Sequence, residues 1–365
     1  MIRTFMTKRL FIRADSGIEK GSGHIMRCLS LAKCLNDIDV SFICRTIPGN
    51  FCDFIEQNGF HVYRLPFNSS LDASNLPVDI KSDIDDTSEI IKQNKIMPDG
   101  IIIDNYDLDY QWESAIRQYT NKIIVIDDLA NRKHDCDLLI DQNLYPDMNI
   151  RYKNLVPHNC LHLLGPKYAL LRPEFIEARK KLRVREGKIN SILISFGSSD
   201  PTNETLKAID ALHQFQSPIK VDVVIGISNP HKELIKEICS KLPNVTYHYQ
   251  TDKMADLMTN ADISIGAGGS TTWERCCLGL PSIVSILSED QFELTKTLAN
   301  EGCVINLGSA STVSSEDYAK AIKNINSVTL RKMSEKCMHL VDGEGSIRVA
   351  KKICSMYGME MHDSN

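Results

Sequence analysis

The sequence lacks the features that mark membrane, secreted and nucleic-acid-binding proteins. No apolar stretch approaches the length of a transmembrane helix, and residues 1–13 contain no apolar run of the kind found in a signal peptide. The formal net charge of −5 and the pI near 6.1 argue against a nucleic-acid surface. We therefore expect a soluble, cytoplasmic protein with no membrane and no nucleic-acid partner.

Metal-site and disulfide patterns are also missing. None of the 12 cysteines forms a C-x-x-C motif, and the 10 histidines show no zinc spacing. The chain is too long for a small disulfide framework, so we expect reduced thiols that are mostly buried, as at the core-like positions Cys28 and Cys34. Asp104 and Asp127 end predicted strands, but acidic pairs arise by chance among 47 acidic residues. We predict no metal and no cofactor.

What the sequence does have is a regular alternation of short apolar runs and helical patterns, in two series. The runs are almost continuously apolar, which is typical of parallel strands covered on both faces. They lie at 10–14, 40–44, 61–65, 100–104, 122–127, 137–141 and 161–165, and then at 191–197, 221–226, 244–249, 262–269, 281–287 and 303–308. The predicted fold class is α/β, with two doubly wound, Rossmann-like domains that face a cleft where a ligand binds.

These series set the expected domain boundaries. An N-terminal domain spans 1–168, a linker 169–188 and a C-terminal domain 189–358, while the tail 359–365 is expected to fray. Three helical patterns close the C-terminal domain, and the last one could pack back on the N-terminal domain. The linker includes the charged run E-A-R-K-K-L-R-V-R-E-G-K (177–188), which we interpret as a solvated helix.

The stretch G-A-G-G-S-T-T-W-E-R (266–275) has the pattern of a phosphate-binding loop. It follows a predicted strand and opens a helix, so its backbone N–H groups and the helix dipole favour an anion. Ser270, Thr271 and Thr272 can cap the helix or donate to phosphate, and Glu274 can accept hydrogen bonds from a ribose diol. The alternative is a simple tight turn, with Ser270 as the cap and Glu274 as its capping-box partner.

The stretch G-S-G-H-I-M-R (21–27) is a second candidate site. It fails as a dinucleotide fingerprint, because the position of the third glycine is Met26. Arg45 could bind a 2′-phosphate, so an NADP-dependent oxidoreductase stays open as an alternative. His24 falls in the first turn of the predicted helix, where the helix N-terminus disfavours imidazolium and lowers the pKa. A neutral His24 could act as a general base near pH 7.

Taken together, the motifs resemble a known family. They are R-A-D-S-x(5)-G-S-G-H-x-M-R-C near the start, I-I-D-N-Y-D-L-D-Y (102–110), L-L-I-D-Q-N-L (138–144), I-S-F-G-S-S-D-P (194–201) and G-A-G-G-S-T-T-W-E-R-C-x-L-G-L-P (266–281). Over about residues 10 to 310 the chain is similar to the UDP-2,4-diacetamido-2,4,6-trideoxy-β-L-altropyranose hydrolases of pseudaminic acid biosynthesis. The resemblance implies a glycosyltransferase-B fold, related to the lipid-linked GlcNAc transferase of peptidoglycan synthesis.

The resemblance also implies roles for individual residues. The family's proposed general base falls on His24, and a tyrosine near the sugar falls on Tyr106. The residues implied to bind substrate are Arg13, Asp15, Gly21, Gly23, Arg27, Asn143, Gly226, Met254, Gly268, Gly269, Ser270, Thr271, Glu274, Asp290 and Gln291. Among these, the glycine loop and its glutamate hold diphosphate and ribose, and the backbone at Gly226 and the loop ending at Met254 meet the uracil. Asp290 departs from the family, which commonly has asparagine there.

The predicted activity is hydrolysis of a UDP-sugar, in which His24 deprotonates a water that attacks the anomeric carbon with inversion. The resemblance implies that the free sugar could pass to a downstream nonulosonic acid synthase. A UDP-sugar-dependent glycosyltransferase of the same fold is the main alternative. A non-catalytic nucleotide-sugar-binding protein would keep 266–275 without needing His24.

Overall fold

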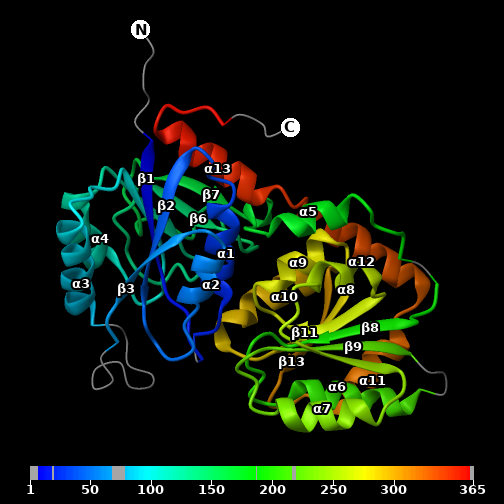
Figure 1. Cartoon of the computed structure of the whole chain (residues 1–365). Helices are drawn as coiled ribbons and strands as arrows, with labels where there is room; N and C mark the ends of the chain where they lie inside the picture. The colour runs from blue at the N-terminus through cyan, green and yellow to red at the C-terminus, as the bar shows by residue number, and fades with distance from the viewer. Residues whose placement is uncertain (1–6, 19, 68–78, 186, 216–218, 362–365) are drawn as a thin grey trace. The chain divides into compact units, whose positions relative to one another are not determined.

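The computed structural model describes residues 7–18, 20–67, 79–185, 187–215 and 219–361 (Figure 1). The chain divides into two compact units. The first unit contains Met1–Asn143, Asp147–Arg172 and Gly345–Asn365, and the second contains Leu144–Pro146 and Pro173–Glu344. Each unit is built on its own sheet, as the sequence predicts.

The first unit has a seven-stranded sheet in the order β3-β2-β1-β4-β5-β6-β7. All neighbouring strands are parallel. The strands are β1 (Lys8–Ala14), β2 (Ile38–Arg45), β3 (His61–Leu65), β4 (Gly100–Asp104), β5 (Lys122–Ile126), β6 (Leu138–Asp141) and β7 (Leu161–Leu164). The predicted strands of the first series are therefore confirmed, with bounds shifted by a residue or two.

The apolar strands of this sheet feed two separate cores, because successive side chains of a strand point to opposite faces. Ile12 and Ile102 belong to one core, whereas their neighbours Phe11 and Ile101 belong to the other. The first core is closed by α1 (Gly23–Ala32), α2 (Cys52–Gln57) and α13 (Gly345–Met356), and the second by α3 (Ile80–Gln93) and α4 (Tyr110–Ile116). Figure 1 shows α3 and α4 on the face of the sheet opposite α1 and α2.

The second unit has a six-stranded parallel sheet in the order β10-β9-β8-β11-β12-β13. Its strands are β8 (Ser191–Ser195), β9 (Lys220–Ile225), β10 (Val245–Tyr249), β11 (Ile263–Ala267), β12 (Ser282–Ile286) and β13 (Val304–Ser309). Its helices are α5 (Pro173–Arg179), α6 (Glu204–Ala211), α7 (Lys232–Ser240), α8 (Met254–Asn260), α9 (Thr271–Cys277), α10 (Phe292–Asn300), α11 (Ser315–Asn324) and α12 (Ser327–Leu340). One core joins α6, α7 and α11 to the sheet, and α8, α9 and α12 lie on the other face (Figure 1).

Each sheet has one point at which the strand order reverses. In the first unit β1 has β2 on one side and β4 on the other, and in the second unit β8 lies between β9 and β11 in the same way. The loops that leave two such strands diverge, which opens space for a ligand beyond their carboxyl ends. The loops after β1 and β4, and after β8 and β11, are therefore the places to look for a site.

The charged run at 177–188 is not the solvated linker helix that its composition suggests. α5 ends at Arg179, which donates hydrogen bonds to two backbone carbonyls of the second unit. Arg183 pairs with Asp262 at 2.6 Å, and Arg185 is buried among backbone carbonyls of the same unit. The run belongs to the second unit because its arginines satisfy carbonyls at the ends of helices, which composition alone does not reveal.

The C-terminal helix α13 packs on α1 in the first unit. The first residue of α13, Gly345, lies against the backbone of Ala169. A Cβ at Gly345 would lie only 2.2 Å from the carbonyl oxygen of Ala169, so this contact requires glycine. The tail predicted to fray from residue 359 packs at its start, because Met359 and Met361 lie against the core of the first unit. The last four residues of that tail, 362–365, lie outside the described residues.

The cysteines behave as the composition predicts. All 12 are free thiols, and only Cys34 and Cys160 are less than fully buried. Across the described ranges, no helix combines the length and the apolar content that a membrane span requires. Those ranges also contain no group of three or more His, Cys, Asp or Glu side chains arranged to hold a metal ion.

Candidate functional site

His24 lies at the switch point of the first unit. The chain leaves β1, forms a small loop closed by a bridge between Gly17 and Gly21, and enters α1 at Gly23. Gly21 has φ of 72°, a left-handed conformation that glycine adopts without strain. His24 is the second residue of α1, as predicted. The turn therefore presents the imidazole at the carboxyl edge of the sheet, with 17% of its side chain exposed.

A buried carboxylate holds the imidazole of His24. Asp104 ends β4, and its neighbour across the sheet is Ala14, the last residue of β1. Its Oδ1 lies 2.6 Å from Nδ1 of His24, and its side chain has no exposed surface. This short contact assigns the proton to Nδ1, which donates to Asp104. Nε2 then carries a lone pair that can accept a proton.

Arg27 lies one turn further along α1 and keeps Asp104 ionised. Its Nε and Nη2 donate to the two carboxylate oxygens at 2.6 Å each, and its Nη1 donates to Asp128 at 3.0 Å. Burial alone would raise the pKa of Asp104, but the charge of Arg27 and the hydrogen bonds from Arg27 and His24 hold this pKa below its ordinary value. Because its guanidinium is bound to two carboxylates, we interpret Arg27 as a residue that holds Asp104 in position and not as a direct substrate contact.

Tyr106 connects Asp128 back to His24 and so completes this network of side chains. Its hydroxyl donates to Asp128 at 2.5 Å, and its ring packs edge-on against the imidazole of His24 at 4.6 Å between centroids. Burial and the charge of Asp128 raise the pKa of Tyr106, so the hydroxyl stays protonated. The structure thus brings the predicted residues His24, Arg27 and Tyr106 together.

Arg13 is not accessible to a ligand. The guanidinium of Arg13 has no exposed surface and is bound by Asp15 and Asp83. Asp15 also accepts the backbone N–H of Arg45, which anchors the loop after β1 to the end of β2. The expected substrate contact of Arg13 is replaced by a supporting one, because two buried carboxylates saturate its cation.

Arg45 is similarly occupied, which removes support for an NADP-binding role. Its Nη2 donates to Asp83 at 2.7 Å and to Asp86 at 3.0 Å, and its Nη1 donates to the carbonyl of Pro66 at 2.6 Å. Only 4% of the residue is exposed. A guanidinium with two carboxylate partners has little capacity left for a 2′-phosphate.

Asn143 follows β6, two strands away from β4. Its backbone N–H donates to Asp141 at 2.9 Å, and Asp141 also accepts from Arg151 and Tyr152. The structure places Asn143 at the same carboxyl edge as His24 but ties it to this second group of side chains. Burial and the charge of Asp128 raise the pKa of Asp141 to about 7.

The glycine loop of the second unit follows β11 at the switch point of that sheet. A Cβ at Gly268 would lie 2.2 Å from the hydroxyl of Thr295, so the loop fits against α10 only with glycine there. The N–H of Gly268 donates to the side-chain oxygen of Gln291 at 3.2 Å. A Cβ at Gly269 would touch nothing closer than 3.9 Å. Gln291 therefore holds the loop from the side.

The alternative interpretation of this loop, a simple turn capped by Ser270, requires a capping hydrogen bond that the structure does not show. Ser270 precedes α9 but makes no side-chain hydrogen bond to the helix, and it is exposed. Thr272 is buried and accepts from Arg275 at 2.9 Å, so its hydroxyl is not presented to a ligand. Thr271 and Glu274 are partly exposed on the first turn of α9. The exposed hydroxyl of Ser270 is free of the helix end and can meet an anion.

The two predicted uracil contacts lie at one edge of the second sheet. A Cβ at Gly226, after β9, would come within 2.3 Å of the backbone of Ser198, so the loops after β8 and β9 touch there. Met254 begins α8, and the loop before it is tied to β9 by the N–H of Gln250, which donates to Ile225. Asp290 lies exposed in a short turn after β12.

Two site residues escaped the sequence reasoning. Asp104 was recognisable as the end of a strand, but its partnership with His24 depends on β1 and β4 being neighbours, which sequence order does not reveal. Asp128 was hidden in the pair Asp127–Asp128, one of many acidic pairs. The useful signal was positional: an aspartate at the carboxyl end of an apolar run beside a histidine-bearing turn.

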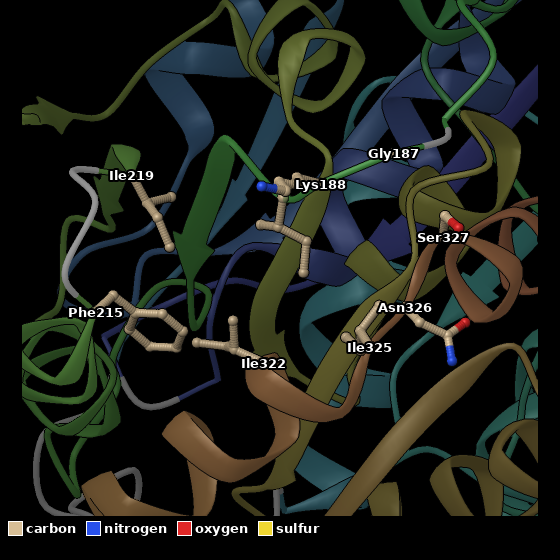
Figure 2. Close-up of a pocket in the computed structure, with 9 residues that line it drawn as sticks. Gly187, Lys188, Phe215, Ile219, Ile322, Ile325, Asn326 and Ser327 are labelled. Atoms are coloured by element: carbon tan, nitrogen blue, oxygen red, sulfur yellow. The ribbon is translucent and has the colours of Figure 1, made fainter.

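The second unit also has an apolar pocket of about 490 Å³ that is separate from these residues. Figure 2 shows Phe215, Ile219, Ile322 and Ile325 lining it. Ile219 immediately precedes β9, so the pocket lies at the amino-terminal edge of the sheet. None of the predicted site residues lines it.

Known proteins resemble the chain along most of its length. Spore coat polysaccharide biosynthesis protein SpsG of Bacillus subtilis is 28% identical over 357 residues, which cover 96% of this chain and 99% of that protein. The UDP-2,4-diacetamido-2,4,6-trideoxy-beta-L-altropyranose hydrolase of Campylobacter jejuni is 28% identical over 271 residues, or 74% of this chain and 88% of that protein. Uncharacterized protein MJ1062 of Methanocaldococcus jannaschii is 28% identical over 78% of this chain, which spans only 57% of that longer protein.

A family model and solved structures add the fold. Residues 191–344 match the model of the glycosyltransferase family 28 C-terminal domain. MurG of Acinetobacter baumannii superimposes with a TM-score of 0.65 at 18% identity, covering 96% of this chain and 100% of that one. UGT89C1 of Arabidopsis thaliana, complexed with UDP, gives a TM-score of 0.65 at 13% identity, covering 96% and 99%. These likenesses confirm the predicted glycosyltransferase-B fold.

Proposed function

We propose that the chain is a nucleotide-sugar-processing enzyme that hydrolyses a UDP-linked diacetamido-trideoxyhexose. The observation that carries the proposal is the 2.6 Å contact between Nδ1 of His24 and Asp104. It fixes the tautomer in which Nε2 can accept a proton, on a histidine that is partly exposed at a switch point. The name of the Campylobacter jejuni relative supplies the substrate.

In this scheme His24 acts as the general base on water. The water oxygen attacks the anomeric carbon while its proton passes to Nε2 of His24. The bond between the anomeric carbon and the phosphate oxygen breaks, and its electron pair leaves with UDP. Because this is a single displacement, the configuration at the anomeric carbon inverts. UDP is a good leaving group, so the scheme needs no general acid.

Asp104, Arg27 and Tyr106 position and stabilise this base. As His24 becomes an imidazolium, the ionised Asp104 faces the new positive charge. Arg27 prevents Asp104 from taking the proton instead, because it binds both carboxylate oxygens. The hydroxyl of Tyr106 is committed to Asp128, so we assign its contribution to the ring that packs against His24.

The second unit is proposed to bind the UDP moiety. The glycine loop would receive the diphosphate through the N–H groups near Gly269 and the hydroxyl of Ser270. Glu274, one turn into α9, would accept hydrogen bonds from the ribose diol, and Gly226 and Met254 lie at the edge proposed for the uracil. Gln291 supports the loop through its side-chain oxygen, and we assign its amide NH₂ group to the sugar side.

A glycosyltransferase is the second candidate, because residues 191–344 match a glycosyltransferase domain. The same base could deprotonate an acceptor hydroxyl instead of water. The two activities differ in one observable, which is whether UDP is released without an acceptor.

The test uses the full-length chain and a panel of UDP-sugars that includes UDP-2,4-diacetamido-2,4,6-trideoxy-β-L-altropyranose. Free UDP and reducing sugar are measured with no acceptor present. Release from the trideoxyhexose donor alone would support the proposal, and release only on addition of an acceptor would favour the transferase. If no UDP-sugar is turned over under either condition, both candidates are wrong.

A further inference from the structure

Arg275 is a buried cation at the base of the glycine loop, and the proposed reaction leaves it without a role. It lies on α9 with 2% of its surface exposed. Its Nη2 donates to the carbonyl of Ala267 at 2.7 Å and to the hydroxyl of Thr272 at 2.9 Å. Its Nε has no hydrogen-bond partner. Within the described residues, Arg275 forms no ion pair with a carboxylate.

The first glycine of the loop makes room for this guanidinium. A Cβ at Gly266 would lie 2.8 Å from Nη1 of Arg275 and 2.3 Å from the carbonyl oxygen of Ser195. The backbone of β8 is therefore the first reason for a glycine at this position of β11, and the missing side chain also leaves room for the guanidinium of Arg275. The side chain is fixed against the backbone of residues 266 and 267, immediately before Gly268 and Gly269.

Burying this cation is unfavourable in the protein without ligand. Burial lowers the pKa of Arg275, although the nearby charge of Glu274 opposes this shift. Arginine nevertheless remains protonated in proteins, so the charge stays. A buried charge without a carboxylate partner is costly, and such groups persist where something else compensates them.

Arg185 provides the contrast within the same unit. It is equally buried, but its guanidinium donates to backbone carbonyls that include those of Ala261, Gly279 and Met258. These carbonyls belong to the C-terminal ends of α8 and α9, where helix dipoles place partial negative charge. All three nitrogens of the Arg185 guanidinium therefore have carbonyl acceptors within the protein, although burial and the nearby Arg183 lower its pKa to about 10. Arg275 belongs to the last turn of the seven-residue α9, but its guanidinium reaches back to Thr272 and to the carbonyl of Ala267. These groups lie on the side of the helix N-terminus, where the dipole has the opposite sign and adds to the charge of the guanidinium.

We propose that Arg275 is the residue that selects a diphosphate over less charged ligands at the glycine loop, by holding an uncompensated positive charge beneath it. The inference rests on the proposed function, which places the UDP diphosphate at this loop. The ligand supplies the negative charge that Arg275 lacks as a partner. Its affinity should therefore rise with the number of phosphate charges. Arg275 acts from below the backbone and needs no direct contact with the substrate.

The experiment measures the dissociation constants of UDP, UMP and uridine for the full-length chain by calorimetry. We compare the wild type with Arg275→Met, Arg275→Lys and the control Arg185→Met. Arg275→Met should weaken UDP binding by roughly 10–50-fold, the effect of one charge acting through a protein medium. UMP should weaken less, and uridine should change less than about 2-fold because it carries no charge. Arg275→Lys restores the charge and should keep most of the preference for UDP over uridine.

Thermal unfolding of each variant without ligand checks that it is folded. If UDP binds Arg275→Met as tightly as the wild type, the inference is wrong and the proposed function stands. Equal weakening of UDP and uridine would also overturn it, since distortion of the loop would explain that result. If Arg275→Met does not fold, Arg275→Lys decides: a lysine variant without the preference for UDP shows that charge is not the determinant. A wild type that binds none of the three ligands contradicts the proposed function itself.

Discussion

The two switch points share a topology but differ in charge. In the first unit, four strands that include both strands of the switch point end on or just before an aspartate: Asp15 after β1, Asp104 on β4, Asp127 after β5 and Asp141 on β6. In the second unit, the chain leaves β9 and β11 through neutral residues, Gly226 and Gly268, and the cation of Arg275 is buried next to the second of them. The buried Asp200 after β8 accepts hydrogen bonds from N–H groups at the start of α6. A diphosphate would meet carboxylates in the first unit and positive potential in the second. Under the proposed function, the first unit would handle the proton and the second unit would bind the anion.

The aspartates of the first unit are held by arginines, and these pairs fix geometry more than they add stability. Arg27 binds Asp104 through two nitrogens, and Arg13 bridges Asp15 and Asp83. A buried ion pair of this kind contributes little to the free energy of folding, because both ions lose their hydration. Its effect is to leave one orientation for His24, the only member of this group that we assign to chemistry.

The largest effect is expected from His24→Gln. If the first unit performs the proton transfer, this variant should lower kcat by roughly 10²–10⁴-fold, the usual weight of a positioned base. The dissociation constant for UDP should change little, because the proposed UDP contacts lie in the second unit. Turnover is followed by UDP release, and His158→Gln, which alters an exposed histidine of the first unit, is the control. Near-normal turnover in His24→Gln would remove His24 from the mechanism.

A smaller loss is expected from Asp104→Asn. An amide places a donor where Asp104 now accepts from both Arg27 and His24, so it favours the tautomer in which Nε2 carries the proton. We expect kcat to fall on the order of 10²-fold with KM nearly unchanged.

Asp128→Asn is the matched comparison for this change, because it leaves the contact between His24 and Asp104 in place. It should reduce kcat less than Asp104→Asn does. Equal losses in the two variants would mean that the buried network matters as a whole and that the tautomer of His24 does not.

The second unit is probed by Gly268→Ala. The added methyl group would lie 2.2 Å from the hydroxyl of the buried Thr295, so the loop must shift. UDP affinity should fall by roughly 10-fold, the cost of misplacing one or two charge-assisted hydrogen bonds. Gly269→Ala, whose methyl group has 3.9 Å of clearance, should cost less. In the double variant Gly268→Ala with Thr295→Ala, the binding should partly recover, and a purely additive result would contradict the steric explanation.

Most of the fold was predictable because the strands are buried on both faces. Such strands are continuous apolar runs, and their positions follow from hydrophobicity alone; β3 and β4 begin and end at the predicted residues. The charged run at 177–188 shows where this reasoning fails. Composition marks arginines as exposed, whereas Arg185 finds enough carbonyl acceptors to be buried. Only the positions of the helix ends reveal those acceptors.

The candidate site was predictable where it depends on local sequence. His24 and the glycine loop each follow from one strand, one turn and one helix. Asp104 could not be paired with His24 from sequence, because 80 residues separate them and the strand order decides that they meet. The roles of Arg13 and Arg27 were missed for a related reason: their carboxylate partners come from other strands and helices.

The smallest effect concerns the crowding of aspartates in the first unit. Burial and the charge of Asp128 raise the pKa of Asp141 to about 7. The folded chain therefore binds this proton more tightly than the unfolded chain, whose aspartates titrate near pH 4. Its stabilising contribution is complete below about pH 4 and is lost as the pH rises through about 7. Asp141→Asn lacks this dependence because an amide does not titrate.

Between pH 5 and pH 8, the Tm of the wild type should fall relative to that of Asp141→Asn by roughly 2–6 °C. Differential scanning calorimetry across this range measures the shift, with Asp85→Asn, which alters an exposed carboxylate of the same unit, as the control. Parallel curves for the wild type and Asp141→Asn would show that Asp141 is ionised throughout. The first unit would then tolerate another carboxylate charge beside Asp128, and the contrast in charge between the two switch points would be larger than proposed.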